Sequence, residues 1–264
     1  MMLEDVFTRA KEEKRTAFIP YVMAGDPDLE TTGEILRALT NAGADAIELG
    51  IPYGDPLADG PTIAAAGMRA LQNGIDIAQV LTFVRVLRSE FAPIVLFTYF
   101  NPVYQYGLQR FANDAAAAGV AGVIVPDLAL EELTKLRKLL LAKDLAMPLL
   151  IAPSTSYARA ARIAKQSTGF VYVVSRMGVT GAATAPDFSP LHDHIESLRK
   201  LTTKPLAVGF GVSKPEHVQE VGPLVDGIIV GSALIDAYAG ARGEVAAARA
   251  EVFIKGLIQA PARN

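Results

Sequence analysis

Two acidic residues in the first quarter of the chain could take part in proton transfer. Glu48 lies near the end of a short apolar run, AIEL at 46–49, and Asp59 follows eleven positions later in a loop rich in proline and glycine. Successive side chains of a β-strand point to opposite faces, so Glu48 points away from Ile47 and Leu49. If those aliphatic residues face helices, Glu48 points into the interior. There, loss of water raises the pKa of a carboxyl group toward values useful to a general acid.

Each of these acids also has a purely structural interpretation. Glu48 could pair with an arginine, or its strand could end sooner than the apolar run suggests. Asp55 or Asp59 could cap the following helix, because aspartate is favoured at that position. We expect the capping role for Asp55, whereas Thr62 competes with Asp59 for it.

Glycine-bearing segments that follow three late apolar runs suit the binding of an anion. They are GVTG at 178–181, GFG at 209–211 and the pair Gly231-Ser232. Glycine lets backbone N–H groups approach an anion closely, and Ser232 adds a hydroxyl at an expected helix start. One such segment could simply be a left-handed turn, but three at corresponding places predict a phosphate site. Arg176 could bind the same anion or pair with a neighbouring loop.

Several other kinds of site find little support in the sequence. The chain contains no cysteine, which excludes disulfides, thiolate metal sites and cysteine nucleophiles. His192 and His194 diverge on a helix, and with His217 alone elsewhere we expect no metal site. None of the expected strands contains lysine, which argues against a Schiff-base aldolase. Residues 178–190 have little charge and no periodicity, so they form either a lid or an ordinary loop.

Composition limits the class of protein further. The 264 residues include 25 basic and 28 acidic side chains, giving a net charge of −3, and 51% are hydrophobic. This balance excludes a largely disordered chain, and without blocks of like charge we expect no nucleic-acid partner. No apolar run approaches the roughly 18 residues of a membrane span. The N-terminal residues carry acids early and lack an apolar core, unlike a targeting peptide. We therefore expect a soluble, cytoplasmic protein without membrane contact.

The elements that would position the candidate residues follow a regular alternation. Helical patterns separate the apolar runs, most clearly at 131–145, where Leu133, Leu136 and Leu140 share one face. Three segments repeat a glycine turn followed by an aliphatic run, at 42–49, 118–125 and 221–230. This alternation predicts parallel strands joined by right-handed crossovers. The expected strands are 18–23, 46–49, 94–98, 122–125, 149–151, 170–174, 206–208 and 227–230.

Eight such units predict an α/β fold, a (β/α)8 TIM barrel that spans residues 1–264 as a single domain. An open doubly wound sheet is the alternative, although no G-x-G-x-x-G motif follows the first run. Leu3, Val6, Phe7 and Ala10 form one stripe, which predicts an N-terminal helix covering the barrel floor. Function in such barrels gathers at the carboxyl ends of the strands, where both acids and the late glycines would lie.

A longer motif adds a family resemblance. The segment IELGIPYGDPLADGP at 47–61 closely resembles the signature of the tryptophan synthase alpha chain family. The departures are Gly54 in place of the usual serine, Ala64 in place of a common glutamine and Ala129 in place of a frequent proline. None touches the expected chemistry, although Gly54 and Ala129 bear on loop stiffness. Six further blocks occur in family order: 20–28, 98–107, 125–132, 175–182, 209–218 and 228–235.

The resemblance implies a lyase of tryptophan biosynthesis that cleaves indole-3-glycerol phosphate to indole and glyceraldehyde 3-phosphate by a retro-aldol reaction. Glu48 would be the acid that protonates C3 of indole, and Asp59 would accept the indole N–H and stabilise the charge that grows on nitrogen. Tyr172 would orient Glu48 through a hydrogen bond. The indole pocket would be walled by Tyr21, Phe97 and Tyr99. The phosphate site would comprise Gly181, Gly211, Gly231 and Ser232, with Phe210 alongside.

The resemblance also implies an α2β2 heterotetramer in which indole passes through a tunnel to a beta chain. Pyridoxal phosphate belongs to that beta chain, so we expect no cofactor here. Loops 53–61 and 178–190 would order on substrate binding and beta contact. Three alternatives stay open: another phosphosugar barrel such as an isomerase or a lysine-free aldolase, a stand-alone indole-releasing lyase, and a non-catalytic phosphate-binding regulatory barrel.

Overall fold

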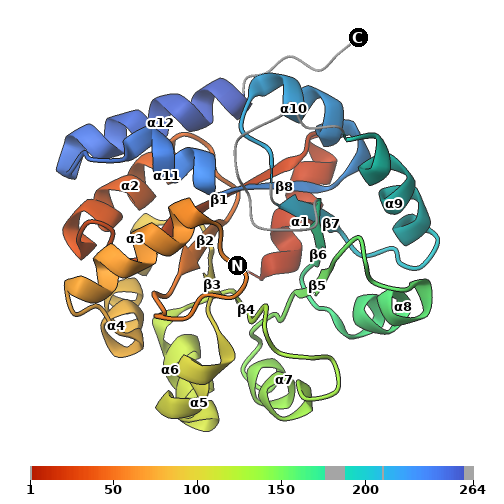
Figure 1. Ribbon diagram of the computed structural model, residues 1–264, viewed down its shortest axis with the longest axis horizontal. Helices are drawn as coiled ribbons and strands as arrows, with labels where there is room; N and C mark the ends of the chain where they lie inside the picture. The colour runs from red at the N-terminus through yellow and green to blue at the C-terminus, as the bar shows by residue number, and fades with distance from the viewer. Residues whose placement is uncertain (1, 176–187, 210, 259–264) are drawn as a thin grey trace.

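The computed structural model describes residues 2–175, 188–209 and 211–258. Within these ranges, eight parallel strands form one sheet in the order β4-β3-β2-β1-β8-β7-β6-β5 (Figure 1). Each observed strand agrees with its predicted range to within one residue at either end, because a strand buried on both faces stands out as a short aliphatic run. The strands are β1 Ala17–Met23, β2 Ile47–Gly50, β3 Ile94–Phe97, β4 Gly122–Ile124, β5 Leu149–Ile151, β6 Val171–Val174, β7 Leu206–Gly209 and β8 Gly227–Val230.

The two end strands of this order approach each other and nearly close the sheet. The Val123 N–H donates to the Ala146 carbonyl over 2.8 Å, and the Ala146 N–H donates to the Ala121 carbonyl over 3.1 Å. Gly122 and Ala146 thereby form a parallel bridge between β4 and the residues just before β5. The predicted barrel is confirmed, and the open-sheet alternative is wrong.

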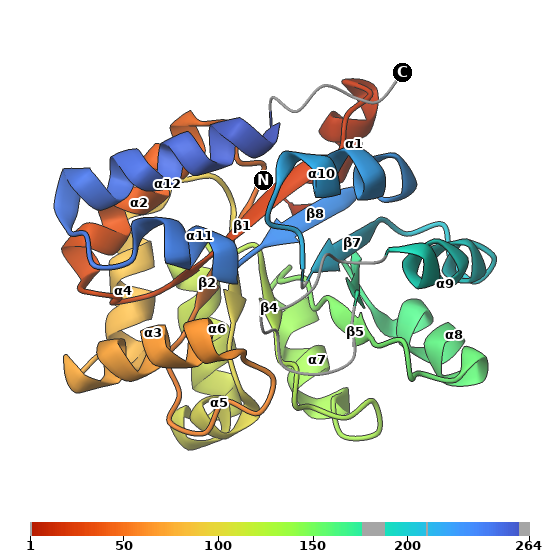
Figure 2. The same ribbon diagram turned by 45° about the horizontal axis from the view of Figure 1, so that its top comes forward.

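The helices surround the outside of the sheet (Figure 1). The loops that follow the carboxyl ends of the strands therefore lie at one open end of the barrel. The long helix α12 lies along α2 (Figure 2). The helices are α1 Leu3–Glu12, α2 Leu29–Asn41, α3 Pro61–Gln72, α4 Ile77–Leu87, α5 Phe100–Tyr106, α6 Leu108–Ala118, α7 Thr134–Leu141, α8 Tyr157–Gln166, α9 Ser189–Arg199, α10 Pro215–Val221, α11 Ser232–Tyr238 and α12 Gly243–Ile258, with short 3-10 turns η1 Arg88–Glu90 and η2 Gly222–Leu224.

The N-terminal helix covers the barrel floor, as its apolar stripe predicted. Leu3, Val6, Phe7 and Ala10 are all buried in α1. The Phe7 ring lies 5.4 Å from the ring of Phe170, which precedes β6 at the amino ends of the strands. Burial of this stripe attaches α1 to the end of the barrel opposite the candidate site.

An ion cluster around Asp45 fastens the same end of the barrel. Asp45 is only 1% exposed, just before β2. Arg15 donates to both of its carboxylate oxygens, over 2.6 and 2.7 Å, and Arg9 donates over 3.0 Å. The Phe18 N–H adds a fourth hydrogen bond of 2.9 Å. This carboxylate is therefore fully paired, as a buried charge must be.

Two predicted boundaries are wrong. The helix expected over 131–145 begins only at Thr134 and ends at Leu141, and Leu133 lies just before it in a series of turns. The loop expected over 178–190 ends earlier, because α9 begins at Ser189 with Pro190 in its first turn, where proline is favoured. Residues 178–187 of that loop lie outside the described ranges.

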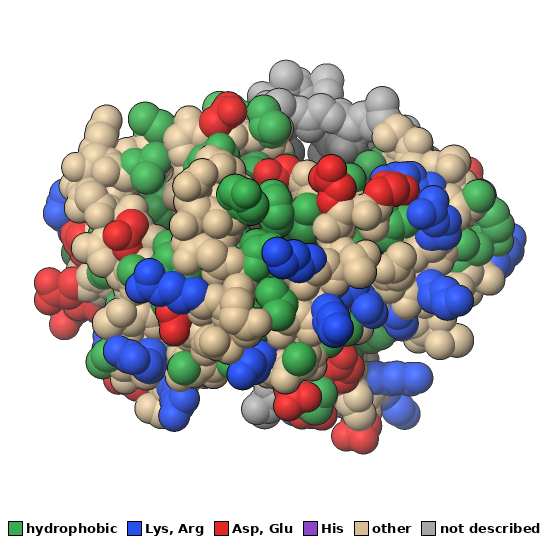
Figure 3. All heavy atoms as spheres, turned by 90° about the horizontal axis from the view of Figure 1, so that it is seen from below, with side chains coloured by type: hydrophobic (Ala, Val, Ile, Leu, Met, Phe, Trp, Pro, Cys, Tyr) green, Lys and Arg blue, Asp and Glu red, His purple; other side chains and the backbone are tan. Residues whose placement is uncertain are grey.

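Charge and hydrophobicity are distributed as in an ordinary globular surface. Figure 3 shows acidic and basic side chains interspersed across one face of the molecule. No helix in the described ranges combines the length and the apolar character needed to cross a bilayer.

Candidate active site

Glu48 lies in β2, and its side chain points into the interior of the barrel. In the parallel register it lies opposite Tyr21 of β1 and Val95 of β3. The side chain is only 2% exposed, and its Oε1 atom has no hydrogen-bond partner among the described residues. Burial, and then the charge of Asp59, raises the pKa of Glu48 to about 8. Within the described ranges no arginine pairs with Glu48 or contributes to its pKa, so no ion pair of the kind that the structural interpretation requires is found there.

Asp59 approaches Glu48 from the loop between β2 and α3. Burial raises the pKa of Asp59 to about 6, and a hydrogen bond from the Tyr99 hydroxyl lowers it. The same hydroxyl accepts the Ala58 N–H over 2.9 Å. Tyr99, which follows β3 and is only 2% exposed, therefore fixes the part of the loop that carries Asp59.

The capping interpretations of this loop are wrong. The N-cap residue of α3 is Gly60, and no side chain caps the helix. Pro61 at the first helical position has no N–H to satisfy, which lowers the need for a cap. Asp55 is exposed, and the Thr62 hydroxyl donates to Asp236 of α11 over 3.2 Å instead. The Asp59 carboxylate is thus free of a structural role at the helix start.

The two acids differ in protonation near neutral pH. With pKa values of about 8 for Glu48 and about 6 for Asp59, the first holds its proton at pH 7 and the second is ionised. Neighbouring carboxyl groups whose environments separate their pKa values are typical of an acid paired with a charge-stabilising carboxylate.

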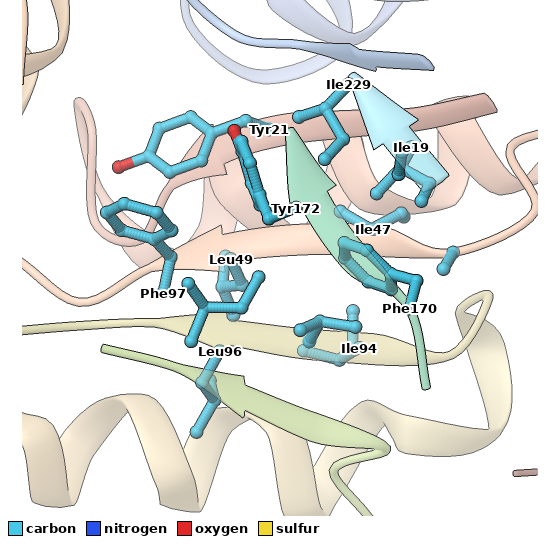
Figure 4. Packing of buried hydrophobic residues seen from close by; sticks show 14 of the residues in the cluster. Ile19, Tyr21, Ile47, Leu49, Ile94, Leu96, Phe97, Phe170, Tyr172 and Ile229 are labelled. Atoms are coloured by element: carbon cyan, nitrogen blue, oxygen red, sulfur yellow. The ribbon is translucent and has the colours of Figure 1, made fainter. Parts of the chain in front are cut away.

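A row of aromatic rings lines the same end of the barrel. Tyr21 and Phe97 meet edge to face with ring centroids 5.8 Å apart (Figure 4). The Phe97 ring also lies 6.5 Å from the Tyr99 ring, measured between centroids. Tyr53, which sequence analysis did not single out, lies 5.3 Å from Tyr99 and extends the row toward the loop. Asn101 donates to the Tyr53 hydroxyl over 3.3 Å. The only sequence signal for Tyr53 was its place within the 47–61 motif.

Tyr172 of β6 enters the interior from the opposite side of the barrel. A Cβ atom at Gly209 would lie 2.2 Å from the Tyr172 hydroxyl oxygen, so glycine is required at that position. Burial raises the pKa of Tyr172, with further contributions from the charges of Glu48 and then Asp59. Tyr172 is therefore close to both acids, and its hydrogen bond to Glu48 stays a prediction.

The predicted phosphate residues are only partly described. Ser232 begins α11 as expected, directly after Gly231. Gly211 has a φ of +121°, a conformation that favours glycine on backbone grounds alone. Gly231 has a φ of −115°, and a Cβ atom there would lie 3.4 Å from Ile63 and 3.5 Å from Tyr21. These are ordinary van der Waals distances, so neither crowding nor a left-handed turn requires glycine at position 231. Gly181, Phe210 and Arg176 lie outside the described residues.

Of the three histidines, His217 has contacts that support the fold. His192 and His194 lie in α9, and His217 of α10 accepts the Ser213 N–H over 3.2 Å. The His217 ring also packs 5.4 Å from Phe188. Across the described ranges, no three His, Cys, Asp or Glu side chains gather in an arrangement that could hold a metal ion.

Comparison with known proteins identifies the family. The family model described as "Tryptophan synthase alpha chain" matches residues 7–260. The chain belongs to the tryptophan synthase alpha chain family. The resemblance inferred from the 47–61 motif is thereby confirmed.

Relatives of the family agree over nearly the whole length of the chain. A tryptophan synthase alpha chain of Prochlorococcus marinus (strain MIT 9313) is 49% identical over 95% of this chain and 92% of its own length. The tryptophan synthase subunit alpha of Legionella pneumophila is 32% identical with a TM-score of 0.88, covering 98% of each chain. A chain of the tryptophan synthase complex from Pyrococcus furiosus is 35% identical with a TM-score of 0.82, covering 92% of this chain and 98% of its own.

Proposed function

We propose that this chain cleaves indole-3-glycerol phosphate to indole and glyceraldehyde 3-phosphate, as the lyase subunit of a tryptophan synthase. The observation that carries the proposal is the protonation pattern of the two acids. A buried Glu48 with a pKa of about 8 holds a proton to give, beside an Asp59 that is ionised at neutral pH. The substrate, whose cleavage needs both a proton donor and a charge-stabilising carboxylate, is inferred from the family to which the chain belongs.

Glu48 acts as the general acid. Indole leaves poorly as a carbon anion, so C3 must be protonated before its bond to the glyceryl chain breaks. Glu48 gives its proton to C3, and the electrons of the breaking bond then neutralise the cationic ring. The glyceryl hydroxyl loses its proton as the aldehyde forms, and the Glu48 carboxylate accepts that proton. The acid is regenerated and no external reactant is required.

Asp59 stabilises the charge that appears between these steps. Protonation at C3 places positive charge on the indole nitrogen, and a carboxylate that accepts the N–H bond offsets it. An amide could hold the ring in place but could not offset the charge. The Tyr99 contacts to Ala58 and Asp59 support this role, because they hold the carboxylate in a fixed loop.

Binding is assigned to two further groups of residues in the same proposal. Tyr21, Phe97, Tyr99 and Tyr172 wall the indole pocket, and their burial near both acids supports the assignment. The phosphate group binds at Gly181, Phe210, Gly211, Gly231 and Ser232.

A partner completes the proposed reaction sequence. Indole passes to a tryptophan synthase beta chain in an α2β2 heterotetramer, and pyridoxal phosphate is held by that beta chain rather than by this one. The name of the Pyrococcus furiosus relative, which is part of a tryptophan synthase complex, supports such a partner. We keep the cytoplasmic location expected from the sequence as part of this proposal.

The decisive experiment is an indole-release assay on indole-3-glycerol phosphate with the purified chain, alone and with a matching beta chain. Release that rises at least tenfold with the beta chain supports the synthase subunit. Equal release with and without it indicates a stand-alone lyase instead. If neither mixture releases indole, the proposal is wrong, and a regulatory barrel or another phosphosugar enzyme takes its place.

A further inference from the structure

The residues on either side of Asp59 are held by different parts of the barrel. On the amino-terminal side, the Ala58 N–H donates to the Tyr99 hydroxyl over 2.9 Å. On the carboxyl-terminal side, Gly60 and Pro61 lead directly into α3, whose start has no side-chain cap. A contact that fixes the start of α3 therefore bears on the position of the Asp59 carboxylate.

The loop that carries Asp59 has little packing of its own. Gly54, Asp55 and Leu57 are exposed, and the exposed fraction of Leu57 reaches 75%. The contacts at the end of the loop therefore decide where the Asp59 carboxylate lies.

The start of α3 is attached to the segment that follows β8. The Thr62 hydroxyl, three residues after Asp59, donates to Asp236 Oδ1 over 3.2 Å and lies 3.5 Å from Oδ2. The Cδ1 atom of Ile63, the next residue, would lie 3.4 Å from a Cβ atom at Gly231. Helix α11 lies beside α3 (Figure 1 and Figure 2). Two consecutive residues of α3 thus contact α11 and the turn before it.

The hydrogen bond between Thr62 and Asp236 joins positions that are 174 residues apart, and neither helix needs it to form. Thr62 does not cap α3. Asp236 lies in the last turn of α11, where an acidic side chain is disfavoured by the helix dipole. The contact therefore connects two segments of the barrel mouth rather than supporting either helix.

We propose that Thr62 is a positioning residue whose hydrogen bond to Asp236 fixes the start of α3 and so holds the Asp59 carboxylate in its partly buried place. The proposal rests on the function proposed above for Asp59 and adds a residue to which that function assigns no role. Tyr99 holds the loop on one side of Asp59, and Thr62 holds it on the other.

The first test is a ¹³C NMR titration of the Asp59 carboxyl in the ligand-free chain, for the wild type and for Thr62→Val. Valine keeps the branched shape and removes the hydroxyl. Burial raises the pKa of Asp59 more than the hydrogen bond from Tyr99 lowers it. A loop that opens loses both effects, so the midpoint falls from about 6 toward the ordinary value of about 3.9. We expect a fall of at least about half a pH unit, and an unchanged or higher midpoint overturns the proposal.

Variants of the acceptor test the same hydrogen bond from its other side. Asp236→Ala removes the acceptor and should lower the Asp59 midpoint as Thr62→Val does. Asp236→Asn keeps one acceptor oxygen and Thr62→Ser keeps the donor, so both should stay near the wild-type midpoint. The double variant Thr62→Val/Asp236→Ala should fall no further than either single variant. Additive falls, or a wild-type midpoint in Asp236→Ala, contradict the proposal.

Asn73→Ala is the matched control, because Asn73 attaches the other end of the same helix. Its side-chain amide donates to the Pro27 carbonyl over 2.5 Å, and the residue directly follows α3. Thermal unfolding should show a similar loss of stability in Asn73→Ala and Thr62→Val, but only Thr62→Val changes the Asp59 midpoint. If both variants lower the midpoint equally, general loosening of α3 explains the result and the proposal is wrong. None of these variants replaces the titratable groups nearest to Asp59, which are Tyr21, Glu48, Tyr99 and Tyr172.

Kinetics then show whether the position of Asp59 matters to the reaction. In Thr62→Val we expect kcat for indole release to fall about three- to tenfold. The Kd of indole-3-propanol phosphate, an unreactive analogue that lacks the glyceryl hydroxyls, changes less than about twofold, because Asp59 offsets a charge that forms only in the reaction. A lowered midpoint with an unchanged kcat overturns the positioning role. A wild-type chain that releases no indole contradicts the proposed function instead, and the titration still decides whether Thr62 holds Asp59.

Discussion

Two buried acids, one just before β2 and one within it, have opposite surroundings. Asp45, at the floor, receives hydrogen bonds from Arg9, Arg15 and the Phe18 backbone. Glu48, three residues later at the mouth, has an Oε1 atom with no partner among the described residues and a pKa raised to about 8. Both side chains are at most 2% exposed, so burial alone does not distinguish them.

Pairing, rather than burial, separates the structural acid from the candidate catalytic one. A carboxylate whose oxygens accept several hydrogen bonds from charged and backbone donors can be buried without loss of the fold. A buried carboxyl group that lacks such pairing keeps its proton at neutral pH, so the protonated form needed for general-acid catalysis is present.

The largest effect is expected for Glu48→Gln. Glutamine keeps the size of the side chain but has no proton to transfer, so indole release falls by at least about a thousandfold. Binding of indole-3-propanol phosphate changes less than about tenfold, because the proton is needed only in the transition state. Steady-state kinetics and equilibrium binding measure the two quantities, and substantial residual turnover would contradict the role of Glu48.

Asp59→Asn should lower indole release about a hundredfold. The amide still accepts the indole N–H but cannot offset the positive charge that forms on the ring. The loss therefore appears in kcat more than in KM, which single-turnover kinetics can separate. A rate near that of the wild type would count against the charge-stabilising role.

Stability should respond in opposite directions at the two acids. Asp45→Asn removes a paired charge and is expected to cost about 2–3 kcal/mol of unfolding free energy, discounted because both arginines are partly exposed. Its kcat stays within twofold of wild type, since Asp45 lies at the far end of the barrel. Urea denaturation with kinetics on the same sample tests both statements, and an intact stability would mean that the cluster is dispensable.

For Glu48 the sign depends on pH. The folded-state pKa of about 8 lies above the ordinary value, so stability contributed by this group is present below about pH 4 and is lost as the pH rises through 8. Glu48→Gln removes this dependence and becomes progressively more stable than wild type from pH 5 to pH 8.5. Thermal unfolding across this range measures the difference, and a constant or reversed difference contradicts the raised pKa.

The wild-type rate itself should be bell-shaped. Asp59 must be ionised and Glu48 protonated, so kcat/KM is greatest between their pKa values of about 6 and about 8. One pH unit outside either limit, the rate falls about tenfold. A profile that is flat up to pH 9 would show that the acid is not Glu48 as described.

The smallest effect is expected for Asp127→Asn. Asp127, from the loop after β4, accepts the Phe100 N–H over 2.9 Å and so holds the residue that follows Tyr99. Asparagine keeps one acceptor oxygen, so indole release by the chain alone falls only two- to fivefold. A loss as large as that of Asp59→Asn would mean that Asp127 acts on the substrate directly.

The strands and the interior position of Glu48 could be predicted from the sequence because both depend on local periodicity. Buried parallel strands are short aliphatic runs, and the period of two fixes which side chains point inward. The helical period predicted the start of α7 too early, at 131–133. Hydrogen-bonded turns place side chains at the same spacing as the first turn of a helix, so the pattern does not distinguish the two. The Glu132 and Leu133 N–H groups both donate to Ala129 there, ahead of the helix.

Details of the candidate site lay beyond the sequence because they depend on contacts between distant segments. Any aspartate shortly before a helix is consistent with a cap, and only the backbone geometry selects Gly60 over Asp55 and Asp59. Tyr53 lies in a loop without periodicity, so its contact with Tyr99 has no local signal. The difference between Asp45 and Glu48 likewise depends on which residues surround each acid in space.

The central claim is that Glu48 is protonated at neutral pH. A ¹³C NMR titration of the Glu48 side-chain carboxyl, assigned by comparison with Glu48→Gln, measures this directly in the ligand-free protein. The predicted midpoint is about 8, with the proton retained at pH 7. A midpoint near the ordinary glutamate value of about 4.3 would contradict the account, because Glu48 would then hold no proton to transfer.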